Sequence, residues 1–107
     1  MAIKYYCMPE AGKVVGVLSG CQDDVINKID KICADTGFDF WADERFIMPR
    51  IFKAEAIVKE GDVYDEEEGK KIVREKIMKR YYASRDKRID LFKCMLINLN
   101  RKVERKK

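Results

Sequence analysis

The chain has 107 residues, of which 47% are apolar and 39% charged, a composition that excludes an intrinsically disordered protein and favours one folded domain. Its apolar runs are too short to cross a bilayer, and its N-terminus lacks the pattern of a signal peptide. It has no histidine, and its four cysteines are scattered without a C-x-x-C pair, which disfavours disulfides, zinc and most nucleophile–base pairs. We therefore predict a cytoplasmic protein that is not an enzyme and carries neither metal nor cofactor.

The net charge of +4 is divided unevenly along the chain. Residues 1–69 carry 8 basic and 15 acidic side chains, a net charge of −7, whereas residues 70–107 carry 15 basic and 4 acidic ones, a net charge of +11. This division indicates either an anionic partner for the C-terminal part or pairing between the two parts, within or across subunits.

The N-terminal part, residues 1–60, predicts a small α+β unit. Residues 3–18 predict a β-hairpin, because two extended apolar segments flank a turn that contains proline and glycine. The next segment predicts a helix that Ser19 or Asp23 caps at its start and Gly37 ends. Its apolar residues recur on one helical face: Val25, Ile26, Ile29, Ile32 and Cys33.

Two segments after this helix predict further strands. Residues 38–48 alternate loosely between apolar and polar side chains, which favours one or two strands. Residues 50–58 alternate more strictly and predict a strand whose buried face carries Phe52, Ala54, Ala56 and Val58. The fold class that follows is α+β, with a small N-terminal antiparallel sheet and one helix, followed by a long C-terminal helical segment over residues 61–107.

The acidic segment "EGDVYDEEEGKKIVREK", residues 60–76, resembles a ligand loop at first sight. Its glycine spacing does not fit a P-loop, and its alternating positions lack the oxygen ligands of a calcium loop. It does fit a helix start, with Asp65 as the N-cap, Glu68 in the manner of a capping box and three glutamates at the positive end of the helix dipole.

Residues 65–105 contain no proline and predict a helix that would be roughly 60 Å long if unbroken. Either the chain bends near residues 81–87, where Ser84 or Asp86 can cap a second helix, or one long helix finds a partner. If Arg85 is counted as one of its positions, the apolar spacing forms a heptad stripe, which favours a helical dimer interface over residues 78–103. The alternative is an amphipathic helix that packs on the sheet of its own chain. The stripe consists of Met78, Tyr82, Ile89, Phe92, Leu96, Leu99 and Val103.

Arginines and aromatic residues alternate along this basic helix, a pattern suited to phosphates and to stacked rings. The alternative is a basic face that is only solvated. We predict that a ligand would be bound by Arg50, Tyr82, Arg85, Arg88, Phe92, Arg101 and Arg105.

The stretch "FKAEAIVKEGDVYDEEEGKKIVREKIMKRYY", residues 52–82, resembles a strand–acidic turn–helix block of small proteins from phages and prophages of Gram-positive bacteria. The characterised proteins that it looks most like are the phage anti-Thoeris proteins, which sequester a cyclic ADP-ribose signal without degrading it. The resemblance implies an N-terminal antiparallel sheet with a helix, and long C-terminal helices that dimerise. It also implies ligand pockets between chains that use arginines and an aromatic residue, which Arg101 and Arg105 fit by their spacing.

The resemblance implies a counter-defence protein in the host bacterial cytoplasm that binds a cyclic ADP-ribose isomer or a cyclic nucleotide. It would act as a homodimer or higher homo-oligomer through the C-terminal helix, without membrane contact. The alternative is an anti-CRISPR-type inhibitor or nucleic-acid-binding phage protein, whose partner would be nucleic acid or a defence protein. A third possibility is a structural or regulatory phage protein whose basic helix meets the acidic part of a neighbour.

Overall fold

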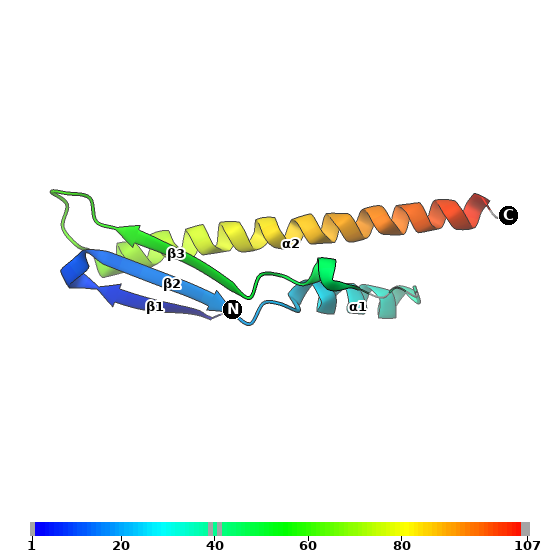
Figure 1. Cartoon of the computed structure of the whole chain (residues 1–107), viewed down its shortest axis with the longest axis horizontal. Helices are drawn as coiled ribbons and strands as arrows, with labels where there is room; N and C mark the ends of the chain where they lie inside the picture. The colour runs from blue at the N-terminus through cyan, green and yellow to red at the C-terminus, as the bar shows by residue number, and fades with distance from the viewer. Residues whose placement is uncertain (1, 39, 41, 106–107) are drawn as a thin grey trace. The chain divides into compact units, whose positions relative to one another are not determined.

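The computed structural model describes residues 2–38, 40 and 42–105, with side chains described up to residue 98. The fold is α+β, as the sequence predicts: a three-stranded antiparallel sheet and one helix precede a long C-terminal helix (Figure 1). In chain order the elements are β1 (Ile3–Met8), the 3-10 helix η1 (Pro9–Ala11), β2 (Lys13–Ser19), α1 (Asp24–Thr36), the 3-10 helix η2 (Glu44–Phe46), β3 (Ile51–Ile57) and α2 (Glu66–Arg105).

The chain forms two compact units, and α2 contributes to both. Unit 1 contains the three strands, the residues up to Gln22 and the segment Pro49–Tyr82. Unit 2 contains Asp23–Met48 and the helix from Ala83 onward. The segments 1–60 and 61–107 distinguished in the sequence therefore each contribute to both units.

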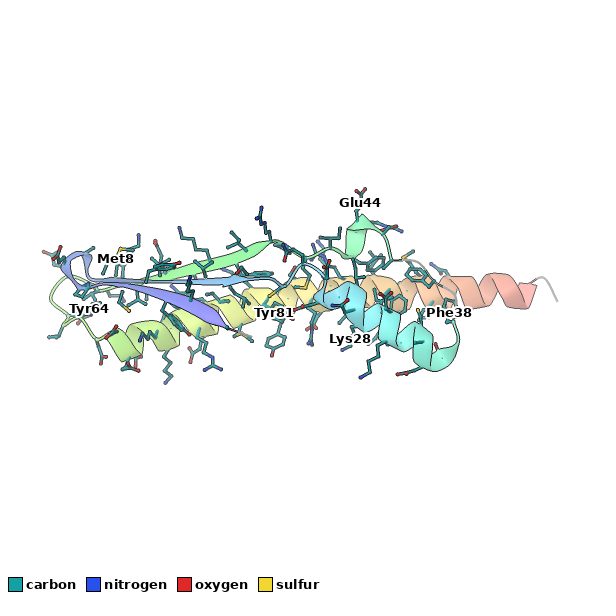
Figure 2. The ribbon with its side chains drawn as sticks, turned by 90° about the horizontal axis from the view of Figure 1, so that it is seen from below. Met8, Lys28, Phe38, Glu44, Tyr64 and Tyr81 are labelled. Carbon is teal, nitrogen blue, oxygen red and sulfur yellow. The ribbon has the colours of Figure 1, made fainter. Side chains whose placement is uncertain are left out.

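The sheet of unit 1 has the order β1-β2-β3, and both pairs of neighbours are antiparallel. The register places Tyr5 and Ala54 on either side of Gly16, which confirms the predicted hairpin and adds β3 to its second strand. The first part of α2 runs alongside the strands (Figure 1). In Figure 2, Met8 and Tyr64 mark the end of the sheet at which β1 turns into β2.

Close packing between β2 and α2 holds unit 1 together. A Cβ atom added to Gly16 would overlap Val73 and touch Ile77, and one added to Gly69 would overlap Val14. Phe52 and Ala54 are buried, and Ala56 and Val58 are half-buried, so the predicted inner face of β3 is confirmed. The fully or nearly fully buried side chains of this unit include Val14, Leu18, Phe52, Val73, Ile77 and Tyr81.

Helix α1 begins after Asp23 and ends at Gly37, as predicted. Gly37 has a φ of +70°, and its N–H bonds to the carbonyl of Cys33, the left-handed ending that glycine favours. Asp23 occupies the N-cap position, but its side chain makes no capping hydrogen bond. The core of unit 2 contains Val25, Ile29, Phe46, Met48, Ile89 and Phe92.

The prediction of one or two strands in residues 38–48 is wrong for the described residues. They form irregular chain and one turn of 3-10 helix, η2. Asp43 accepts a hydrogen bond from the backbone N–H of Arg45 at 2.9 Å and also pairs with its guanidinium, which lowers the pKa of the Asp43 carboxyl. Such local side-chain bonds stabilise a turn in place of a strand ladder. The apolar side chains Phe46 and Met48 are nevertheless buried.

The acidic segment begins a helix, as predicted, because Asp65 Oδ1 accepts a hydrogen bond from the N–H of Glu68 at 3.2 Å. The helix α2 then runs without interruption, so residues 81–87 contain no second helix start. Ser84 does not act as a cap; its hydroxyl and its carbonyl both accept hydrogen bonds from Arg88. The choice between one helix and two is thus decided in favour of one.

Candidate functional site

The seven residues predicted to bind a ligand are distributed over both units. Arg50 and Tyr82 belong to unit 1, where Arg50 is exposed and Tyr82 is 42% exposed. Tyr82 packs edge-on against Tyr81, with ring centroids 5.4 Å apart. The predictions for Arg101 and Arg105 lie outside the described side chains.

In unit 2, Arg88 and Phe92 serve the packing of the unit itself. Arg88 donates from Nε to the carbonyl of Ile47 at 3.1 Å and from Nη1 to the carbonyl of Ser84 at 3.0 Å. This joins the chain after η2 to the helix. Phe92 is 1% exposed, and its ring centroid lies 5.1 Å from that of Phe40. Arg85 is half-buried, with Nη2 3.3 Å from the carboxylate of Asp86.

A cleft in unit 1, between the free edge of β3 and α2, brings basic side chains together. Lys76 donates from Nζ to the carbonyl of Glu55 at 3.0 Å, and Arg80 donates from Nη1 to the carbonyl of Lys53. The cleft has a volume of about 310 Å³ and is lined by Lys53, Ala54, Glu55, Lys76 and Arg80. We call it the basic cleft.

The electrostatics of the basic cleft favour an anion. Two of its lining side chains, Lys76 and Arg80 of α2, are cationic, and the carboxylate of the lining residue Glu55 is neutralised by Lys13, whose Nζ lies 2.8 Å from it. The hydrogen bond and charge of Lys13 lower the pKa of the Glu55 carboxyl. An ammonium has three donors and a guanidinium five, so Lys76 and Arg80 keep donors beyond those given to the strand. A phosphate, with several acceptor oxygens, matches such a set of donors.

The same contacts protect the edge of the sheet. β3 is an edge strand, and its outer carbonyls would otherwise be open to pairing with another chain. Lys76 and Arg80 bind the carbonyls of Glu55 and Lys53 and so cover part of this edge. The basic cleft therefore has a structural role in addition to any binding role.

A second groove of unit 1, of about 270 Å³, does not suit a phosphate. Its walls are mainly apolar, and the three carboxylates of Asp62, Asp65 and Glu68 outnumber its one cation, Lys59. Tyr64 also lines this groove, and burial raises the pKa of its phenol, with a smaller contribution from Cys7. These carboxylates would repel an anion, so the two hollows of unit 1 differ in the sign of charge that they accept.

Cys7 is not activated as a nucleophile. A hydrogen bond to Glu66 and partial desolvation raise the pKa of its thiol above the ordinary value. Because the thiolate is the reactive form, a raised pKa keeps Cys7 protonated and unreactive near neutral pH.

Lys53, Lys76 and Arg80 were not among the predicted site residues. The spacing of Lys76 and Arg80 places both on one helical face, which the sequence could have suggested. Their position against Lys53, which is 27 residues from Arg80, depends on how α2 packs along β3. Periodicity within one segment does not reveal such a contact.

The chain matches no protein-family profile, no curated protein and no solved structure. Among the residues that the structure describes, no group of three histidine, cysteine or carboxylate side chains could hold a metal ion. No helix in this described part is both long and apolar enough to span a membrane.

Proposed function

We propose that this chain is a phage or prophage counter-defence protein that binds a phosphorylated, nucleotide-derived immune signal and sequesters it without degrading it. The ligand class is a cyclic ADP-ribose isomer or a cyclic nucleotide. The observation that carries the proposal is the basic cleft, in which Lys76 and Arg80 of α2 keep spare hydrogen-bond donors beside the β3 edge at Lys53. All three residues lie in the segment 52–82 that resembles the phage proteins.

Binding without turnover is supported by the chemistry available around the cleft. The chain has no histidine to serve as a general base. Glu55, the carboxylate of the cleft, is engaged by Lys13 and has a lowered pKa, which makes it a weak base. Tyr82 exposes part of its ring in the same unit and can present an aromatic face to a nucleobase.

Isothermal titration calorimetry with cyclic ADP-ribose isomers and cyclic nucleotides tests the proposal. We expect binding by at least one of them, and a loss of tenfold or more in affinity in Lys76→Ala/Arg80→Ala, since each lost charge-assisted hydrogen bond costs about 1.5–3 kcal/mol. Lys71→Ala is the control, because it removes a lysine on the side of α2 opposite Arg80. Absence of heat with every ligand, or an equal loss in the control, would contradict the proposal.

A nucleic-acid-binding or anti-CRISPR-type role is the alternative, and the net charge of +11 over residues 70–107 favours it. Binding through phosphates releases counterions, so its affinity falls steeply with salt. A small ligand held in the cleft gives a shallower dependence. Titrations at about 50 and 200 mM salt with single-stranded oligonucleotides and with the cyclic ligands separate the two functions.

The proposal includes a homo-oligomer that forms through the C-terminal helix. Ile89 and Phe92, two residues of the heptad stripe, are buried in the core of unit 2 and are not available to a partner. Leu96 is half-buried and lines an apolar hollow of about 210 Å³ together with Phe92 and three residues of the α1 region, Ile32, Thr36 and Phe38. We therefore place the contact at Leu96 and this hollow.

Leu96→Lys is expected to shift the protein to a smaller species in light scattering, because a charge would have to be buried at the helix contact. Asn98→Lys adds the same charge at an exposed position of α2 and should leave the mass unchanged. A wild-type monomer, or equal masses for all three proteins, would refute the helical interface.

A further inference from the structure

The sheet of unit 1 has one face that α2 does not cover. β2 faces α2 through Val14 and Gly16, so the alternate residues of each strand lie on the other side. We call this side the open face; it carries Lys4, Tyr6 and Met8 of β1, Lys13, Val15 and Val17 of β2, and Ile51, Lys53, Glu55 and Ile57 of β3.

The open face exposes more apolar side chains than is usual for a sheet face in contact with water. Tyr6 is 47% exposed, Met8 41%, Ile51 53% and Ile57 61%. Antiparallel sheets with one face in water usually place polar side chains there. Four large apolar side chains gathered on one face of three short strands therefore indicate a contact surface.

The strand register arranges the charges of the open face in rows. One central row runs Lys4–Val17–Lys53, and the next runs Tyr6–Val15–Glu55. Ile51 lies beyond the first row, and Met8, Lys13 and Ile57 form the row beyond the second. Within the described residues, no carboxylate lies within salt-bridge distance of the ammonium of Lys4 or of Lys53.

We propose that the open face binds the open face of a second copy of this chain, about a two-fold axis that crosses the strands between the two central rows. This symmetry exchanges the rows. Lys53 then faces the partner's Glu55, and Lys4 faces the ring of the partner's Tyr6, a cation–π arrangement. The apolar residues also meet: Ile51 lies over the partner's Ile57, and Val17 lies over the partner's Val15, which is 6% exposed within its own chain.

The charges select this arrangement over the other two-fold stacking. An axis parallel to the strands keeps the rows and exchanges β1 with β3, which would place Lys4 opposite the partner's Lys53. Like charges at close range across an interface are unfavourable. The axis that crosses the strands instead gives Lys53 and Lys4 favourable partners. It also lets Glu55 lie between Lys13 of its own chain, 2.8 Å away, and the partner's Lys53. The result is a six-stranded β-sandwich.

The contact is small, so the dimer forms at high protein concentration. A face three strands wide and about seven residues long lies near the lower limit of specific interfaces. Self-association is therefore best measured by sedimentation equilibrium over a wide range of protein concentration, from low micromolar to near-millimolar.

A charge exchange between Lys53→Glu and Glu55→Lys tests the pairing of these two residues. Each variant alone would place like charges opposite each other in its homodimer and should self-associate at least tenfold more weakly than the wild type. When the two variants are mixed in equal amounts, a dimer of one chain of each has opposite charges at both contacts, so association should return. The gain on mixing is the decisive readout, because contacts through the C-terminal helix are the same in both variants.

Lys71→Glu is the control, since it makes the same charge change at an exposed position of α2 and should behave as the wild type. Circular dichroism melts of each variant establish that it is folded. A wild-type chain that does not self-associate through this face, or a mixture of variants no larger than either alone, would overturn the proposal. Ligand titration of the wild type reports the proposed function separately.

Discussion

Gly16→Ala is expected to destabilise the protein by about 1–3 kcal/mol, the usual cost of adding an atom to a well-packed core. In an extended strand with open space, alanine would instead be tolerated or stabilising, because it lowers the entropy of the unfolded chain. Gly16 lies in the middle of β2, against α2, and an added Cβ would overlap Val73. The side chain of valine is stiff about its first torsion, so Val73 cannot easily turn away.

A double-mutant cycle in urea identifies the cause of this loss. Val73→Ala alone should also destabilise, because Val73 is fully buried and its removal leaves a cavity. It deletes the atom that the new methyl group would strike, so Gly16→Ala/Val73→Ala should cost at least about 1 kcal/mol less than the sum of the two single changes. Additive costs would show that the close approach of strand and helix does not limit the residue at position 16.

Phe92→Ala is expected to cost about 3–5 kcal/mol of folding free energy, the range for removing a large buried ring. Phe92 is 1% exposed and packs against Phe40, with ring centroids 5.1 Å apart. The neighbouring residue Leu91 is 36% exposed, and Leu91→Ala should cost less than about 1 kcal/mol. Urea denaturation followed by circular dichroism measures both.

The Phe92 experiment also distinguishes a core residue from a ligand-stacking one. A residue that only stacks on a ligand would leave stability nearly unchanged on truncation and would abolish binding. A small stability loss in Phe92→Ala together with lost binding would therefore contradict its place in the core of unit 2. A large stability loss in Phe92→Ala would confirm Phe92 as a core residue, and the basic cleft would then be the main candidate for the ligand site.

Several elements could be predicted because short-range interactions specify them. The hairpin in residues 3–18 follows from two extended segments around a turn, and the end of α1 follows from the left-handed φ of Gly37. The start of α2 follows from the cap at Asp65. The buried side of β3 follows from strict alternation. In each case the relevant residues lie within a few positions of one another.

Local hydrogen bonds also explain why the strand prediction for residues 38–48 is wrong and why no second helix begins at residues 81–87. Residues 38–48 have apolar side chains at strand-like spacing, but Asp43 and Arg45 stabilise a turn there, and the apolar residues Phe46 and Met48 are buried from irregular chain. The bend at residues 81–87, one of the two alternatives for this helix, assumed that a serine or an aspartate would start a new helix. Ser84 instead accepts hydrogen bonds from Arg88, four residues further along the same helix.

The sequence by itself determined the α+β class, most element boundaries, the division of charge and the helix start in "YDEEEGKK", because hydrogen bonds and periodicity within a segment specify these features. Only the tertiary structure decided which basic residues meet. It directs Arg88 and Phe92 into the packing of unit 2 and sets Lys76 and Arg80 against β3. It also leaves one face of the sheet uncovered. These outcomes depend on contacts between residues far apart in the chain, whose geometry is set by packing and not by local pattern.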